Sequence, residues 1–316
     1  MIKIKHIQGL LRTVGKLSAH QCQEVRKVLD KREVQVESDL LLAELTDAVD
    51  SCPRCSCKAI SRVGSKGGRK RFKCKKCLKT FNALTGTAMA RLRKAPKYVE
   101  YAAWMVVVAP LRWAAEELEV DVHTVFRWRH RFLDSIRRIQ PEKLTGLVEA
   151  DETFFLLSYK GSRHLPPGRI AKKKGTPARK RGLSNEQIPV LVARDRSTGN
   201  TLTSRIPSRR AMDIAPLLLP RLGKDAVLCS DGASAYRIIA KRAEIEVKST
   251  PAKQSAGVYH IQNVNSYDSR LKTWMKRFKG VATKYLDNYL SWHRLLDRKG
   301  AHMSSGDFLL AVLNRS

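Results

Sequence analysis

Four cysteines constrain the fold of this chain more than any other feature of its sequence. They form two Cys-x-x-Cys pairs, Cys52/Cys55 and Cys74/Cys77, with eighteen residues between the pairs. This spacing is typical of a zinc ribbon, in which four thiolates hold one Zn²⁺ tetrahedrally. Because all four ligands come from the protein, such a metal is structural rather than catalytic. We therefore predict a zinc ribbon over residues 49–88.

Cysteine placement and hydropathy indicate the compartment. Five of the seven cysteines lie between Cys52 and Cys77, and such clustering in a cytosolic chain indicates metal binding more often than disulfides. Cys57 is left out of the site because Cys52 and Cys55 already complete the first pair. No run of eighteen apolar residues is present, and no apolar signal core begins the chain. We expect a cytoplasmic protein with no membrane partner.

The charge of the chain predicts a polyanionic partner. There are 61 Lys and Arg against 29 Asp and Glu, a formal net charge of +32. Such a field attracts nucleic acid or an anionic membrane surface. Between Ser51 and Tyr98 there are fifteen Lys and Arg and no acid. Solvated loops could carry some of this charge, but contacts with DNA phosphates explain it better.

Two helical regions flank the ribbon. Residues 1–48 form a helical lead-in, where Ser18 and Gln21 resemble a capping box and predict a helix from 19 to about 31. Residues 95–140 have the rhythm of a helix-turn-helix, with Leu111 to Leu118, a short turn and Val122 to Leu133. Arg127 and Arg131 can face a DNA groove; an ordinary helical hairpin between two domains is the alternative.

Three carboxylates interrupt an apolar strand predicted over residues 147–155. Alternate side chains of a strand share a face, so Glu149 and Asp151 point one way and Ala150 and Glu152 the other. Carboxylates in such a strand are costly unless they are paired or bind a cation. The alternative is a strand end whose acids are solvated or face lysines.

Further alternation and turn residues predict a mixed α/β domain around this strand. The expected elements are strands over 188–194 and 200–206, a helix over 211–222, a strand over 226–230, a helix over 233–242, a strand over 244–248 and a long terminal helix. Asp231 follows the fourth strand. In a sheet where the first and fourth strands are neighbours, Asp151 and Asp231 converge, and their repulsion favours bound divalent cations.

A basic excursion interrupts this domain at residues 158–187. It holds nine Lys and Arg and no acid from Ser158 to Ser184, including Lys172, Lys173 and Lys174. Its Pro and Gly content indicates a loop. We expect it to follow a phosphate backbone; a disordered basic linker is the alternative.

A resemblance emerges from the spacing of these residues. Asn265 follows Asp231 by thirty-four positions, and Lys272 follows Asn265 by seven, which places both on one helical face. The pattern resembles the D-D-E/N-K signature of bacterial insertion-sequence transposases of the DDE superfamily. The ribbon, the turn at Asp231 and the helix from His260 to Lys272 are most similar to the ISXO-like group, in the branch that has Asn in place of Glu. The resemblance covers roughly residues 50–290.

The resemblance implies an RNase H-like catalytic domain over residues 144–296, followed by a tail at 297–316. It implies cleavage of double-stranded DNA at transposon ends and transfer of the 3′-hydroxyl into target DNA. Asp151, Asp231 and Asn265 would bind two Mg²⁺ or Mn²⁺, and Lys272 would contact DNA phosphate. It further implies a homo-oligomer on DNA, in a bacterial cytoplasm and associated with the nucleoid.

Asn265 departs from the common pattern because it is neutral and a weaker ligand. Asp268, three residues on, or Glu149 could supply the missing carboxylate, although a salt bridge also explains Glu149. A DNA-binding regulator without catalysis is the alternative function, and a nuclease that only cuts is a weaker one. Strand joining would separate the nuclease from a transposase.

Overall fold

The computed structural model describes residues 4–67, 69–92, 95–167, 184–249 and 257–313. The chain divides into two compact units, one of Met1–Trp128 with Ser304–Arg315, the other of Arg129–Met303. Within the described ranges, no helix is both long enough and apolar enough to cross a membrane.

The first unit is mainly helical. Its helices are α1 (Ile4–Val14), α2 (Ala19–Asp47), α3 (Ala95–Val106), α4 (Leu111–Glu117), the start of α5 (Val122–Arg137), and α10 (Ser305–Leu313). The expected capping box is present: Ser18 Oγ accepts the N–H of Gln21, and Gln21 Oε1 accepts the N–H of Ser18. However, α2 extends well past residue 31, because no Gly or Pro interrupts its sequence.

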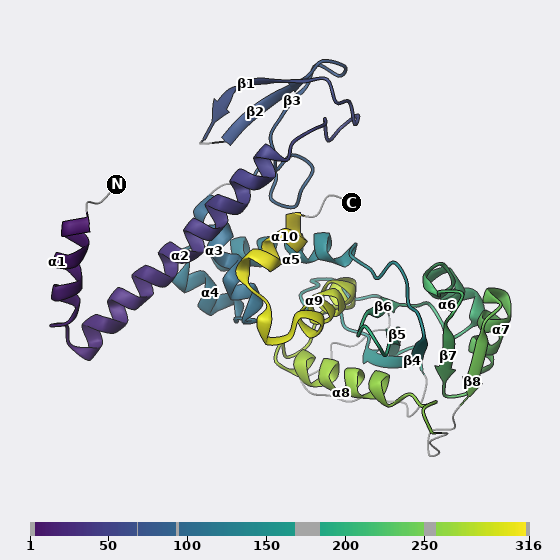
Figure 1. The fold of residues 1–316 in the computed structure, drawn as a ribbon. Coiled ribbons are helices and arrows are strands. Elements are labelled where there is room, and N and C mark those ends of the chain that lie inside the picture. The colour runs from purple at the N-terminus through teal and green to yellow at the C-terminus, as the bar shows by residue number, and fades with distance from the viewer. Residues whose placement is uncertain (1–3, 68, 93–94, 168–183, 250–256, 314–316) are drawn as a thin grey trace. The chain divides into compact units, whose positions relative to one another are not determined.

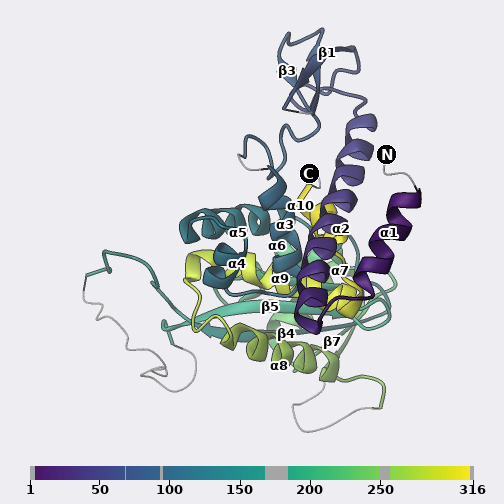
Figure 2. The same ribbon diagram turned by 90° about the vertical axis from the view of Figure 1, so that its left-hand side faces the viewer.

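The segment expected as a C-terminal tail contains α10. Phe308 and Val312 of this helix are buried, and α10 packs against α3 and α2 in the first unit (Figure 2). The partners of α10 lie two hundred or more residues earlier in the chain. Local patterning therefore could not reveal that this segment is packed.

The cysteine-rich region forms a small antiparallel sheet. Its strands are β1 (Ile60–Lys66), β2 (Arg69–Cys74) and β3 (Thr80–Phe81), in the order β1-β2-β3. Phe72 stacks on Phe81 with ring centroids 5.7 Å apart. Phe81 and the buried Cys52 and Cys74 belong to one small core. So small a core leaves most of the stabilisation to a metal.

The second unit contains a mixed five-stranded sheet, as predicted. Its strands are β4 (Leu147–Leu156), β5 (Gln187–Asp195), β6 (Thr201–Arg205), β7 (Val227–Ser230) and β8 (Glu246–Ser249), in the order β6-β5-β4-β7-β8 (Figure 1). β4 is antiparallel to β5 and parallel to β7, and β8 is parallel to β7. The first and fourth strands are therefore neighbours, as the site prediction required.

Helices form a separate core on each face of this sheet. α6 (Ala211–Leu218) and α7 (Ser234–Ala243) pack with Leu191 and Ala193, whereas α8 (Gln262–Lys276) and α9 (Leu286–Lys299) pack with Val190 and Val192. Because neighbouring residues of a strand point to opposite faces, these cores lie on opposite sides of β5.

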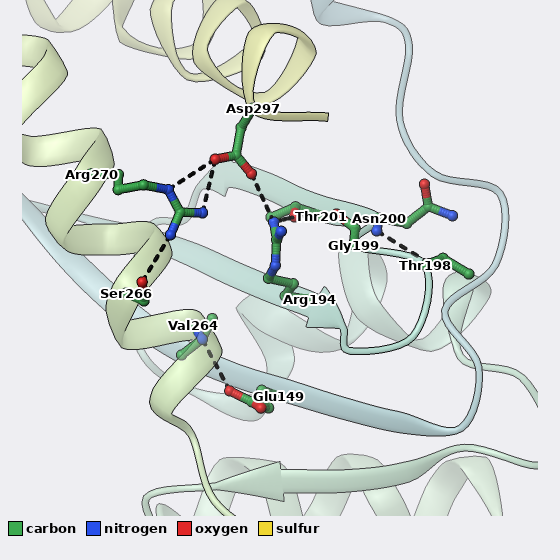
Figure 3. Close-up of polar contacts among 10 residues, drawn as sticks. All are labelled: Glu149, Arg194, Thr198, Gly199, Asn200, Thr201, Val264, Ser266, Arg270 and Asp297. Atoms are coloured by element: carbon green, nitrogen blue, oxygen red, sulfur yellow. Dashed lines mark hydrogen bonds and ion pairs between the residues drawn. The ribbon is translucent and has the colours of Figure 1, made fainter. Parts of the chain in front are cut away.

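The expected single terminal helix is two helices, α8 and α9. The break contains Lys279 and Gly280, with φ of 51° and 96°, values that no α-helix accommodates. Asp297 of α9 ties the pieces together: its carboxylate accepts hydrogen bonds from Arg194 of β5 and Arg270 of α8 (Figure 3).

A buried histidine makes this core sensitive to acid. Burial lowers the pKa of His293 to about 4, and the ring packs against Tyr267 and Trp274. Because folding lowers the pKa of His293, the neutral ring contributes fully to the free energy of unfolding above its unfolded-state pKa, near 6.5. This contribution is lost as the pH falls through the folded-state pKa of about 4. The shift corresponds to about 3 kcal/mol at pH 4.

We expect His293→Leu to remove much of this acid sensitivity. Thermal unfolding of the full chain from pH 7 to pH 4 measures it, as the difference between variant and wild type, so that contributions common to both cancel. His302→Leu, at an exposed position, is the matched control and should follow the wild type. Equal acid sensitivity in the wild type and His293→Leu would contradict the assignment.

Candidate active site and metal sites

The two cysteine pairs meet at one point in the first unit. Cys52 Sγ lies 3.7 Å from Cys77 Sγ, and Cys55 Sγ lies 3.6 Å from Cys74 Sγ. Tetrahedral Zn–S bonds of about 2.3 Å place sulfur atoms about 3.8 Å apart. All four sulfur atoms lie within 4.8 Å of one another, and Cys57 is outside this group. The geometry fits one structural Zn²⁺.

A backbone contact favours the thiolate form that a metal needs. The N–H of Cys77 points to the Sγ of Cys74 at 3.5 Å. This hydrogen bond is the largest influence; with further hydrogen bonds from the N–H of Lys76 and from the Cys55 and Cys77 thiols, and against the effect of burial, it lowers the pKa of the Cys74 thiol to about 6. Thiolates rather than thiols are the metal ligands, so the loop after β2 favours metal binding.

In the second unit, parallel pairing brings Asp151 and Asp231 side by side. The register joins Leu147 to Val227, Val148 to Leu228 and Glu149 to Cys229. The same offset sets Asp151 level with Asp231, the first residue after β7. Burial raises the pKa of the Asp151 carboxyl to about 6, and the negative charge of Asp231 adds to the shift. A divalent cation relieves such repulsion and prefers oxygen ligands.

The side chain of Glu152 leaves β4 on the face opposite to that of Asp151, and it has partners of its own. Its buried carboxylate accepts hydrogen bonds from Arg209 Nε at 2.8 Å and from the hydroxyl of Tyr236 at 2.6 Å. Its backbone N–H donates to Asp151 Oδ1 at 2.7 Å. Sequence reasoning missed Arg209 and Tyr236, because a loop arginine and a core tyrosine carry no local signal. The apolar strand around Glu152 indicated only that some partner must exist.

Glu149 is engaged in holding α8 to the sheet. Its carboxylate accepts hydrogen bonds from Arg196 and from Asn263 Nδ2. It also accepts the N–H of Val264 at 3.0 Å, the contact that Figure 3 shows. The ion pair with Arg196 measures 2.8 Å, and the Glu149 side chain is fully buried. Both oxygens of Glu149 are therefore used in fixing the start of α8 against β4.

α8 presents three polar residues of interest. Asn265 and Lys272 are both exposed, whereas Asp268 between them is 7% exposed. Burial raises the pKa of the Asp268 carboxyl to about 7; the charge of Lys272 opposes this shift and that of Asp151 adds to it. The structure thus directs Asp268, rather than Asn265, towards Asp151.

The expected DNA-reading residues lie on α5 as the periodicity placed them. Arg127 and Arg131 are exposed, while Val125, Phe132 and Leu133 are buried. Asp121 precedes the helix and accepts the N–H of His123 at 2.8 Å, which caps its first turn. The basic residues Lys172, Lys173 and Lys174 lie outside the described residues.

Comparisons with known proteins identify the second unit. Residues 143–292 match the family of ISXO2-like transposase domains. A Halobacterium salinarum protein, described as an uncharacterized protein in transposable element ISH50, is 28% identical over 247 residues, covering 76% of this chain and 82% of its own.

Solved structures give more distant likenesses. The catalytic core domain of BIV integrase aligns with 50% of this chain and 87% of its own, at 14% identity and a TM-score of 0.30. A chain of the pre-cleavage Mos1 transpososome aligns with 66% of this chain and 77% of its own, at 14% identity and a TM-score of 0.24. The family match and the curated relative confirm the resemblance to insertion-sequence transposases of the ISXO-like group that was drawn from the sequence, with residues 143–292 matching the ISXO2-like transposase domain.

Proposed function

We propose that the chain cleaves DNA at the ends of an insertion sequence and joins the freed 3′-hydroxyl to target DNA, with two divalent cations. The observation that carries this proposal is the level placement of Asp151 and Asp231 within the transposase domain. These carboxylates, with a ligand from α8, would hold Mg²⁺ or Mn²⁺. When bound, such cations activate the attacking oxygen and stabilise the leaving one. We further propose that the second unit is an RNase H-like core.

Other residues of the second unit would hold the DNA. Arg209 is fixed by Glu152, yet its side chain is 38% exposed, so its guanidinium is available to a phosphate. A groove of about 870 Å³ opens beside Arg209, with Arg205 and Arg210 also in its lining. Lys272 is exposed one turn beyond Asp268 and would contact phosphate near the reacting strand.

DNA binding by the first unit would be separable from this chemistry. The zinc ribbon and α5 supply basic residues without a catalytic carboxylate, and the net charge of +32 favours binding that weakens steeply with salt. Because a transposition reaction joins two ends, we propose that the chain acts as a homo-oligomer on double-stranded DNA. A bacterial cytoplasmic location, associated with the nucleoid, belongs to the same proposal.

We expect Arg127→Ala to weaken discrimination between end DNA and unrelated DNA. A base contact from the second helix of a helix-turn-helix is worth about 1–3 kcal/mol of discrimination, whereas a phosphate contact affects all sequences alike. Titration of both DNAs at several salt concentrations measures this effect. Arg112→Ala, on α4 and also exposed, is the matched control. Neutralising Lys172, Lys173 and Lys174 should weaken binding to both DNAs equally. Equal losses on both DNAs for Arg127→Ala would overturn the recognition role.

The chemistry is tested by incubating the full chain with a labelled duplex that carries the element's end. We expect nicks that expose a 3′-hydroxyl at the end, with Mg²⁺ or Mn²⁺ present. Chelation by EDTA should stop the reaction, because the carboxylates alone provide no activated nucleophile. Undiminished nicking in EDTA would count against the divalent-cation proposal.

A further inference from the structure

One carboxylate oxygen of α8 is buried without a partner. Asp268 is 7% exposed, and its Oδ1 has no hydrogen-bond partner among the described residues. The hydroxyl of Thr153 on β4 is buried too, and it lies near enough to the Asp268 carboxyl to act as a hydrogen-bond donor that lowers the pKa of this carboxyl. An unsatisfied buried polar atom is destabilising, and more so when it is charged. At the edge of a candidate metal site, such an oxygen is available to bind a cation.

The position of this oxygen relates it to Asp151. Thr153 lies two residues after Asp151, so both side chains leave β4 on the same face. α8 packs across β4 on that face, and the negative charges of Asp268 and Asp151 repel each other. Asp151 therefore interacts with Asp231 from the β7 side and with Asp268 from α8.

Asn265 has none of these properties. It lies one turn before Asp268 and is exposed, and its N–H donates a helical hydrogen bond to the carbonyl of Ile261. An amide also brings no charge to offset a divalent cation. Of the two positions, Asp268 thus has both the burial and the charge that a cation ligand requires.

We propose that Asp268 is the third carboxylate ligand of the divalent-cation site that Asp151 and Asp231 begin. The proposal rests on the proposed function and names the ligand that α8 supplies. Among the described residues, no three carboxylates have oxygens all within 4.8 Å of one another. A site for two cations about 3.5–4 Å apart does not require this, because its outer ligands bind different ions. Asp151, Asp231 and Asp268 would together hold the cations.

Direct measurement of Mn²⁺ binding by titration calorimetry and electron paramagnetic resonance tests the proposal without DNA or turnover. We expect Asp268→Asn to lower the affinity for one Mn²⁺ by about tenfold or more. Mutating a residue that only hydrogen-bonds to a metal ligand already lowers metal affinity by that factor. Asp268→Glu keeps the charge and should retain part of the affinity. Asn265→Ala tests the competing ligand on the same helix and should bind Mn²⁺ like the wild type; loss of Mn²⁺ binding in Asn265→Ala but not in Asp268→Asn would overturn the proposal.

Stability in EDTA separates a metal ligand from a structural residue. Asp268→Asn should melt at the wild-type temperature or higher without metal, because it removes a buried carboxylate without a partner, and it should lose much of the stabilisation by Mn²⁺. If Asp268→Asn binds Mn²⁺ normally while Asp151→Asn does not, the metal site stands but Asp268 is not one of its ligands. Normal binding by both variants would reject the proposed metal site itself.

Discussion

Replacing Asp151 by asparagine should abolish both DNA cleavage and strand joining. The variant removes a negative charge that would hold the cations needed in the transition state. Removing a single neutral hydrogen-bond donor that stabilises a transition state already lowers the rate of an enzyme by about 10²–10³, so the loss of a charged metal ligand should cost at least as much. We therefore expect a reduction of at least about a thousandfold. Asp231→Asn should have an effect of the same size. Single-turnover assays on labelled end DNA measure both variants.

Binding of end DNA should survive these changes, because neither carboxylate attracts a polyanion. Asp225→Asn is the matched control: it removes an exposed carboxylate close to the start of β7 and should leave the rate unchanged. Asp151→Asn or Asp231→Asn with near-normal cleavage would show that the paired carboxylates are not the catalytic centre. Loss of end binding in these variants would instead indicate that they damage the fold.

Cys74→Ser should release the zinc and unfold the ribbon. The ribbon's apolar core is small, and structural Zn²⁺ contributes roughly 10–16 kcal/mol of apparent binding energy in zinc-finger peptides. Elemental analysis should give one zinc per wild-type chain and none in the variant. Limited proteolysis should become rapid within residues 50–85, while the second unit stays protected.

Two other cysteines provide the controls for this experiment. Cys57 lies between the pairs but outside the group of four, and Cys229 is buried in the second unit. The variants Cys57→Ser and Cys229→Ser should both keep the full zinc content. Full zinc retention in Cys74→Ser would contradict the ribbon assignment.

Much of the sheet and half of the candidate site followed from local sequence rules. Alternation along residues 147–155 placed Asp151 and Glu152 on opposite faces, and the structure gives them separate partners. The position of Asp231 after a buried strand, together with the expectation that strands one and four are neighbours, brought the two aspartates together. These rules work because strand geometry alternates strictly and strand ends meet at one edge.

The remaining features depend on contacts between distant segments. The bond between Arg209 and Glu152 joins a loop to a strand fifty-seven residues away, and no periodicity reports such a pairing. The roles of Asn265 and Asp268 could not be separated from the sequence, because both lie on the same helical face as Lys272. Burial against β4 distinguishes them, since Asp268 is covered and Asn265 is not.

The most direct test of the central claim is a joining assay with the full chain, Mg²⁺, a DNA fragment that carries the element's end, and a supercoiled target plasmid. We expect the fragment's 3′ strand to become covalently linked to the plasmid, in the wild type and not in Asp231→Asn. Cleavage at the end without any joined product would identify a nuclease. If the wild-type protein binds the end but neither cleaves nor joins it with Mg²⁺ or Mn²⁺ present, the protein is a DNA-binding regulator, which would contradict the proposed function.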